Sequence, residues 1–582
     1  MARGDGSIPF IVVQFLTMLQ TFGRLFSFIG MTLAAPLAAA GTLHVDADLV
    51  TGLNDGSTWA DAYQGSGGLQ LALAASVAGD QIFVAEGTYL PAVSGRPTSF
   101  NLRTGVEIYG SFLGTEATPA ERPPFGTAPS ILQSDLNGDD GAGMLIDNSY
   151  HVLRGAGVDS TAVLDGFTVT GGVADGNGNN DKGGGILCVN GASPTVRNCH
   201  FVGNRCTFGG GAGYINGSTP TFTDCTFEDN IGGSFGGAFD MATAGPLRFD
   251  RCVFIGNRAQ RAGALEVFAS NGIEVTNCSF FDNTATGASG GGALWIGQGS
   301  NTLVVNCSIV GNSSTNQAAG GIRVQSAAPV IRNTILWANT GPGGAQGSIN
   351  QVTASANLAH CIVEGGFAGA SNLAADPQLA DMGIGDLRLT LASPAIDAGD
   401  NGAVPAGISL DLAQAARIVD EPDVADTGLG SAPIVDMGAF ESALVITSNF
   451  CLVSPNSAGA GAVMGSSGST SVSGNGFSLE ATGVVPNVFG IFFYGGAQLQ
   501  APFGDGFRCA GGTGTHRLHP LVQADGSGAV TRLLDLTAPP LSSGSGAITP
   551  GSTWNFQLWY RDIAAGGAGF NTSDGLSATF AP

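Results

Sequence analysis

The feature that most constrains the fold is a short phrase repeated through the middle of the 582-residue chain. Each copy has a polar residue, a cysteine, a variable residue, an apolar residue (usually Phe), two variable residues and, in most copies, an asparagine. The cysteine position, or its threonine substitute, falls at Cys199, Cys225, Cys252, Cys278, Cys307, Thr334 and Cys361. Successive copies are 26, 27, 26, 29, 27 and 27 residues apart. Because this period is so regular, it predicts one structural unit stacked on itself.

The unit itself consists of short strands. A second phrase, rich in glycine and then apolar (for example 236–239), lies between the cysteine phrases. Both phrases alternate apolar and other residues, are bounded by turn-forming residues, and are not separated by a helical pattern. Cys199 and Phe201 have the same parity, so both are expected to point inward while His200 points outward. The pattern predicts an all-β fold whose coils form a parallel β-helix with a spacing of about 4.8 Å.

Equivalent positions of stacked coils form ladders. The expected cysteine and aromatic ladders are Cys199, Cys225, Cys252, Cys278 and Cys307, and Phe201, Phe227, Phe254 and Phe280. Neighbouring cysteines would lie about 4.8 Å apart with parallel side chains, beyond the Cβ separation of about 3.5–4.5 Å that a disulfide prefers. We interpret them as buried thiols that fill the core. Metal binding is the alternative, but the repeats lack close ligand spacing.

These phrases resemble the Gly-Gly-Ala and Phe-x-x-Asn repeats of the chlamydial polymorphic outer-membrane proteins. More broadly, residues 42–445 resemble secreted bacterial right-handed parallel β-helix proteins with a pectate-lyase-like fold. Flanking phrases at 55–60, 81–89, 393–399 and 436–441 are similar to those of β-helix proteins with a C-terminal choice-of-anchor region. The resemblance implies a right-handed helix but leaves the activity open, because this fold carries lyases, hydrolases, adhesins and passive surface proteins.

We therefore predict a signal peptide over 1–40, a right-handed parallel β-helix over 41–445 with its clearest coils at 164–366, and a small antiparallel β-sandwich over 446–582. The last region resembles a C-terminal module of secreted planctomycete-type proteins. Cys451 and Cys509 lie in it, apart from the repeats, and are the pair expected to form a disulfide. Trp559 and Tyr560 are interpreted either as part of a carbohydrate-binding face or as ordinary packing. His516 and His519 are expected on opposite sides of a strand.

The amino terminus predicts export. Arg24 precedes an apolar stretch that ends in the small-residue sequence Ala38-Ala39-Ala40-Gly41, the arrangement of a cleaved secretory signal. An uncleaved anchor is the alternative. No other stretch is long and apolar enough to form a transmembrane helix, so none is expected in the mature chain. We predict a secreted or cell-surface protein of unspecified oligomeric state.

One acidic loop resembles a calcium site. Asp135, Asn137, Asp139 and Asp140 place oxygen ligands at near-alternate positions, as a hard cation requires. The loop departs from the EF-hand pattern, since its glycine falls one place late and no glutamate follows at the twelfth position. The competing interpretation is a solvated acidic turn. Two looser acidic groups lie at 175–181 and at Asp420, Asp423, Asp426 and Asp436. Calcium is the only cofactor that the residues suggest.

The charge of the chain and its lack of recognisable catalytic motifs limit the possible functions. The formal net charge of −24 argues against nucleic acid and favours cations, or simply solubility. A Gly-x-Ser-x-Gly match at 287–291 lies in a repeat bend and not on a strand-to-helix elbow. Charged residues at outward positions are interpreted as a scattered, solvated surface: Arg205, Glu228, Asp229, Asp240, Arg258, Arg261, Glu266 and Arg323.

Three functions remain open. The first is a non-catalytic secreted or surface protein acting in adhesion, envelope structure or matrix contact. The second is a polysaccharide lyase or glycoside hydrolase, which a carboxylate or arginine cluster on adjacent coils would favour. The third is carbohydrate binding, which an exposed aromatic row including Trp295 and Trp337 would favour. The regular repeats favour the first function, with a polysaccharide or another surface or matrix component as partner.

Overall fold

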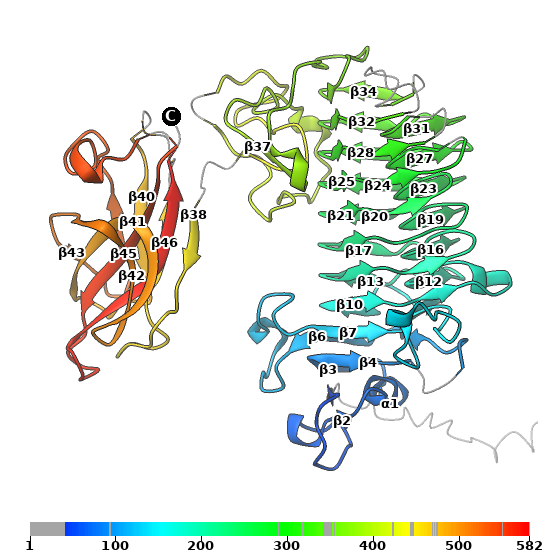
Figure 1. Ribbon diagram of the computed structural model, residues 1–582, viewed down its shortest axis with the longest axis horizontal. Helices are drawn as coiled ribbons and strands as arrows, with labels where there is room; N and C mark the ends of the chain where they lie inside the picture. The colour runs from blue at the N-terminus through cyan, green and yellow to red at the C-terminus, as the bar shows by residue number, and fades with distance from the viewer. Residues whose placement is uncertain are drawn as a thin grey trace, which may run out of the picture.

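The computed structural model describes residues 41–580 except 92–94, 289, 316–318, 342–351, 354–355, 422–423, 443–446, 468–469, 471, 473–474 and 550. The predicted signal peptide and Asp423 therefore lie outside the described residues. Three long parallel sheets run side by side along most of the chain, as Figure 1 shows. The all-β class and the parallel β-helix predicted from the repeats are confirmed.

Each complete coil contributes one strand to each of the three sheets, and the coils at the two ends of the stack contribute to fewer. The 12-stranded sheet contains β2 (Tyr63–Gln64), β1 (Thr42–Asp46), β3 (Gln81–Ala85), β6 (Glu107–Phe112), β9 (Val163–Asp165), β13 (Thr195–Arg197), β17 (Thr221–Thr223), β20 (Leu247–Asp250), β24 (Asn271–Thr276), β28 (Asn301–Val305), β32 (Val330–Arg332) and β34 (Asn357–Ala359). The 10-stranded sheet contains β4 (Gly87–Tyr89), β7 (Ser130–Gln133), β10 (Phe167–Thr170), β14 (His200–Val202), β18 (Thr226–Glu228), β21 (Val253–Ile255), β25 (Ser279–Phe281), β29 (Ser308–Val310), β33 (Ile335–Trp337) and β35 (Ile362–Val363). The 8-stranded sheet contains β5 (Phe100–Asn101), β8 (Leu153–Ala156), β12 (Ile186–Val189), β16 (Gly213–Asn216), β19 (Phe239–Ala242), β23 (Leu265–Phe268), β27 (Leu294–Gly297) and β31 (Ile322–Gln325).

Shorter elements complete the helix. Two-residue strands bridge the second and third sheets in some coils: β11 (Val173–Ala174), β15 (Arg205–Cys206), β22 (Arg258–Ala259), β26 (Thr284–Ala285) and β30 (Ser313–Ser314). Helix α1 (Gly68–Ala75) lies at the N-terminal end of the stack (Figure 1). It buries Leu69, Ala72 and Leu73 in the core, and so covers apolar side chains that the first coils would otherwise expose.

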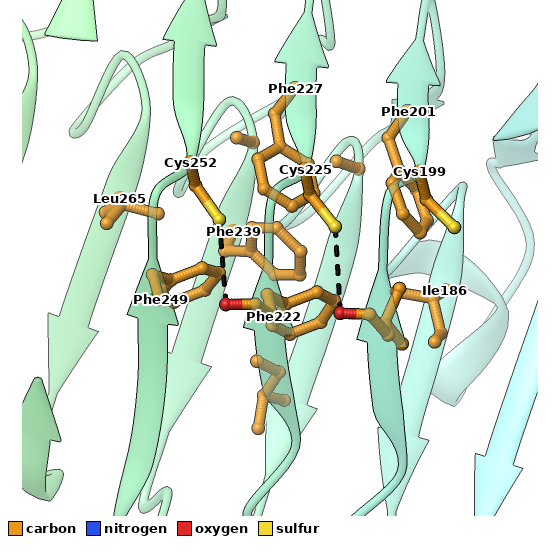
Figure 2. Packing of buried hydrophobic residues seen from close by; sticks show 14 of the residues in the cluster. Ile186, Cys199, Phe201, Phe222, Cys225, Phe227, Phe239, Phe249, Cys252 and Leu265 are labelled. Carbon is orange, nitrogen blue, oxygen red and sulfur yellow. Dashed lines mark hydrogen bonds between the residues drawn. The ribbon is translucent and has the colours of Figure 1, made fainter. Parts of the chain in front are cut away.

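Aromatic rings fill the core in register. Phe227 pairs with Phe254, and Phe254 with Phe280, with ring centroids 4.9 and 4.6 Å apart. Phe222 and Phe239, from the other two sheets, pack against the ring of Phe227 in the same interior (Figure 2). Because all these side chains are fully buried, each coil is held mainly by the apolar area that it shares with its neighbours.

An asparagine ladder accompanies the aromatic one. The backbone amide and Nδ2 of Asn257 donate to Oδ1 of Asn283 at 3.0 and 2.9 Å. Nδ2 also donates to the carbonyl oxygen of Phe227 at 2.8 Å. The amide-to-amide step repeats through Asn204, Asn230, Asn257, Asn283, Asn312 and Asn339. Each buried amide therefore joins its own coil to the coils on both sides, which favours a single register.

Residues 379–442 fold back along the flank of the last coils. The antiparallel pair β36 (Leu379–Asp381) and β37 (Asp386–Leu389) begins this segment. A separate apolar cluster joins Leu387, Ala395 and Met437 of the segment to Val310 and Ile335 of the 10-stranded sheet. The segment thus covers the outer face of that sheet, whereas the sequence predicted only irregular ends to the helix.

The C-terminal region from 447 onward is an antiparallel β-structure of two sheets around its own core. One sheet contains β38 (Thr447–Phe450), β46 (Phe570–Thr579), β45 (Thr553–Arg561), β41 (Phe489–Phe503), β42 (Gly506–Arg517) and β43 (Val522–Gln523). The other contains β39 (Val463–Ser467), β40 (Ser478–Thr482) and β44 (Val530–Leu533). A disulfide links Cys451 to Cys509 and closes a 58-residue separation. Chain entropy assigns such a closure about 4 kcal/mol of stability.

Replacing Phe254 with Ala tests the ladder. We expect the free energy of unfolding to fall by about 3–5 kcal/mol, because the ring has stacked partners on both sides and the coils cannot close the gap. Chemical denaturation of the variant beside Phe125→Ala, whose ring is 49 % exposed, provides the comparison. Equal midpoints for Phe254→Ala and the parent would contradict the in-register packing.

Candidate functional site

The acidic loop after β7 gathers carboxylates around one point. Asp135 is buried, and its Oδ1 accepts hydrogen bonds from the backbone amides of Gly138 at 2.7 Å and Asp139 at 3.1 Å. Its Oδ2 accepts from the amide of Asp140 at 3.2 Å. These bonds curl the loop, so that ligand oxygens of Asp135, Asp139 and Asp140 lie within 4.8 Å of one another.

Asp147 and Asn148, at the end of the same loop, are two further ligand candidates. Buried oxygens without a hydrogen-bond partner belong to Asp139, Asp140, Asp147 and Asn148. Burial first, and then the charge of Asp147, raises the pKa of Asp139, and burial raises that of Asp140. Asn137 is exposed and contributes its backbone amide to Asp147 Oδ2 at 3.0 Å. The oxygen set fits a hard cation such as Ca²⁺. Asp147 and Asn148 were missed because they lie outside the motif.

The geometry of the cysteine ladder indicates a structural role. All five ladder thiols are buried, and each donates to the carbonyl oxygen two residues earlier, as Cys225 does to Thr223 at 3.3 Å. Cys225 and Cys252 also reach carbonyls of the neighbouring coil, those of Val196 and Phe222 (Figure 2). The residue before each cysteine is in the left-handed region, with φ of 54° at Asp224 and 52° at Asn277. The thiols therefore satisfy carbonyls at a tight bend, a role for which reactivity is not needed.

A carboxylate pair on adjacent coils is the largest departure from the sequence-based prediction. Asp240 and Glu266 are register partners on β19 and β23, at outward positions interpreted as solvated. They are instead 4 % and 1 % exposed, so that interpretation is wrong. Burial, followed by the charge of Glu266, raises the pKa of Asp240 well above its usual range. Burial also raises the pKa of Glu266.

Arg261 and two aromatic rings cover the carboxylate pair of Asp240 and Glu266. The Arg261 guanidinium forms an ion pair with Glu266 and lies 4.3 Å from the ring centroid of Phe235 and 4.2 Å from that of Trp295. Trp295 is itself only 2 % exposed, and Trp337 packs against the flanking segment. The predicted exposed aromatic row is therefore not formed by these two residues. A glycan cannot reach carboxylates so covered, and the cluster is better suited to a structural role.

The C-terminal β-structure carries an open groove of about 1030 Å³. Its floor consists of side chains on the outer face of the larger sheet: Ile491 and Phe493 on β41, Trp559 on β45, which is the cross-strand partner of Ile491, and Thr515 on β42. Phe503, Arg508, His516, Arg517, His519, Leu521 and Pro540 complete the lining. β42 ends at Arg517, so His519 leaves the strand alternation and lines the same groove as His516. The His516 ring packs against Tyr494 and Trp554 of the core side, so the expectation that the two imidazoles point to opposite sides stays a prediction.

The groove is aromatic and basic. The ring of Trp559 lies 5.5 Å from that of Phe570, which in turn lies 5.3 Å from Phe503. Tyr560, by contrast, is fully buried in the core, so only one member of the pair singled out in the sequence reaches this face. Four lining residues are basic (Arg508, His516, Arg517 and His519), and among the described residues that line the groove none is acidic. This is unusual in a chain with 45 acidic and 21 basic residues other than His.

Comparison with known proteins supports the architecture. Residues 134–264 and 245–379 match the family described as the right-handed β-helix region. The match and the parallel sheets together define a right-handed parallel β-helix protein, as predicted. No curated protein shows significant similarity to the chain. In the parts of the chain that the structure describes, no helix has the length and apolarity needed to cross a bilayer.

Asp240→Asn tests the buried pair through pH. A raised pKa means that the folded state holds its proton more tightly, so the associated stability is complete below about pH 4 and is lost as pH rises through the raised value. The amide cannot ionise. We therefore expect the free energy of unfolding of the variant to improve relative to the parent between about pH 4 and 8, measured by urea denaturation.

Asp48→Asn is the matched control, since Asp48 is exposed. It should show no stabilisation over the parent comparable to that of Asp240→Asn. A difference from the parent that stays constant with pH for Asp240→Asn would mean that Asp240 titrates normally in the folded protein.

Proposed function

We propose that this is a secreted or cell-surface, non-catalytic β-helix protein that contacts an acidic polysaccharide through its C-terminal groove, in adhesion or in matrix structure. The observation that carries the proposal is the lining of the groove. It combines the aromatic faces of Trp559 and Phe503 with the charges of Arg508, Arg517 and His519. The β-helix then acts as a rigid body that presents this module.

The chemistry of the groove suits a glycan with carboxylate or sulfate groups. Sugar rings offer apolar C–H faces that pack on aromatic side chains, while their substituents hydrogen-bond at the edge. Arginine pairs with carboxylate or sulfate through charge-assisted hydrogen bonds. Because the remainder of the chain is strongly acidic, an anionic ligand would be repelled elsewhere and favoured at this basic patch.

The thiols support export. Cys451 and Cys509 are paired, whereas the eight remaining cysteines are free and buried. A single disulfide outside the repeats, with all other thiols shielded, is compatible with an oxidising compartment. Together with the secretory-type amino terminus, this favours the cell surface or the extracellular medium over the cytoplasm.

Calcium is proposed as a structural ion of the loop at 135–148. Asp135, Asp139, Asp140, Asp147 and Asn148 would hold it through carboxylate and amide oxygens. The support is the group of buried oxygens without partners, together with the burial and the repulsion from Asp147 and Asp135 that raise the pKa of Asp139. A divalent cation would relieve that repulsion and fix the loop before the β10 coil.

A second candidate function is polysaccharide cleavage at Asp240 and Glu266. A carboxylate pair on adjacent coils is the arrangement expected of a hydrolase or lyase on this fold. The burial of both side chains under Arg261 and Trp295 counts against it. Release of product from a polysaccharide would decide in its favour.

The groove proposal is tested on a panel of neutral, uronic-acid and sulfated polysaccharides, scored for both retention and product release. We expect retention of acidic polysaccharides without cleavage, weakening as salt is raised. Trp559→Ala should weaken binding by about 1–2 kcal/mol, or roughly tenfold. Arg517→Gln should do the same for acidic ligands only.

Arg205→Gln is the matched control for Arg517→Gln, because Arg205 is an exposed arginine on the β-helix. It should bind like the parent. Equal binding by all three variants and the parent would contradict the groove. Product release that Glu266→Gln abolishes would replace the proposal with the enzymatic one.

Asp147→Asn tests the loop ion. We expect the parent to show terbium luminescence that calcium displaces, and calcium to raise its melting temperature by mass action. In the variant, the terbium luminescence and the calcium-dependent rise in melting temperature should both lose the contribution of this loop. Identical terbium titrations of parent and variant would show that Asp147 holds no ion.

A further inference from the structure

A second acidic cluster lies in the segment that covers the flank of the helix. Asp397, Asp420 and Asp426 bring ligand oxygens within 4.8 Å of one another. The backbone fixes two of the three. The carbonyl oxygen of Asp397 accepts from the amides of Thr427 at 2.9 Å and Gly428 at 3.0 Å. Asp426 is therefore held beside Asp397 by the adjoining residues.

Asp397 is the informative member. Its side chain is 0 % exposed, and neither carboxylate oxygen has a hydrogen-bond partner. A buried carboxylate without a partner is costly, since an ionised group in that position is normally paired, hydrogen-bonded or bound to a metal.

Among the described residues, no ion pair or side-chain hydrogen bond neutralises the Asp397 carboxylate. Arg417 is the only basic residue between Asp397 and Glu441, a stretch that contains nine acidic residues. Arg417 is buried in an ion pair with Glu441 at 2.7 Å, and it also donates to the carbonyl oxygen of Asp436 at 3.0 Å. Asp436 in turn accepts from the amides of Asp397 and Ser442. Arg417 is thus engaged with Glu441 and Asp436, and within the described part of the chain it forms no ion pair or hydrogen bond with the Asp397 carboxylate.

The rim of the cluster is open. Asp420 and Asp426 are exposed, so a cation could enter from solvent and reach the Asp397 oxygens beneath. Oxygen ligands in an irregular loop suit Ca²⁺, which accepts variable geometry and six to eight ligands, better than Mg²⁺, which requires near-octahedral geometry. Water and backbone carbonyls would supply the other ligands.

We propose that Asp397, Asp420 and Asp426 bind a calcium-class divalent cation that holds together the part of the flanking segment that packs on the last coils of the β-helix. The segment is attached there by polar contacts on both sides of the cluster, such as Asp400 N to Asn333 Oδ1 at 2.7 Å and Ala439 N to Ser308 Oγ at 3.0 Å. An ion at this point would join residues 397–400, 420 and 426 in one unit. This site is independent of the groove and of the loop at 135–148.

Calorimetric titration of the full chain with CaCl₂, after removal of metals by EDTA, tests the proposal. The parent should bind two ions if the first loop is also occupied, and Asp139→Asn should bind one. Asp397→Asn and Asp426→Asn should each lose the other ion. Asp426→Asn guards against misfolding, because its side chain is exposed, and Asp48→Asn is the matched surface control that should titrate like the parent.

Melting in EDTA gives a second readout. Without calcium, Asp397→Asn should melt at the same temperature as the parent or higher, because the unpaired buried charge is gone. Added calcium should not raise the melting temperature of Asp397→Asn through this site. Calcium titrations of Asp397→Asn and Asp426→Asn that match the parent would overturn the proposal. A parent that binds a single ion, removed by Asp139→Asn, would overturn it too.

Discussion

The structure depends on keeping successive coils in register, and the buried asparagine ladder is the interaction that enforces it. Each amide from Asn204 to Asn312 donates to the next coil, so a slip of one residue would leave several buried donors unpaired. The Phe201–Phe280 stack is part of a large apolar core, but apolar packing alone tolerates other arrangements. Register is what brings Asp240 beside Glu266 and fixes the bends where the cysteines satisfy carbonyls.

Much of the fold was predictable because the period of 26–29 residues and the parity of Cys199 and Phe201 state the geometry directly. The candidate functional sites were less predictable from the sequence. Parity places Glu266 on the outside of the coil, but its burial arises from Arg261 and from rings that fold over the sheet, which no local pattern records. Asp147 and Asn148 meet Asp139 only because the loop closes on Asp135. The groove combines β41, β42 and β45 with residues 519–540, which are distant in sequence.

Charge is distributed in a way that gives the two parts different tasks. The β-helix and its flanking segment hold carboxylates in groups that favour cations, at 135–148 and around Asp397. The C-terminal β-structure gathers arginine, histidine and aromatic side chains on one face. The proposed cation sites and the proposed groove for an acidic polysaccharide are both consistent with the proposal of a secreted or cell-surface protein.

Hydrogen exchange in the presence of an acidic oligosaccharide tests the central claim most directly, because it reports where on the chain the ligand binds without assuming the residues. The account predicts slower exchange of amides in β41, β42 and 518–523, and unchanged exchange in β19 and β23. Protection centred on β19 and β23, around Asp240 and Glu266, would contradict it and place the functional site on the β-helix.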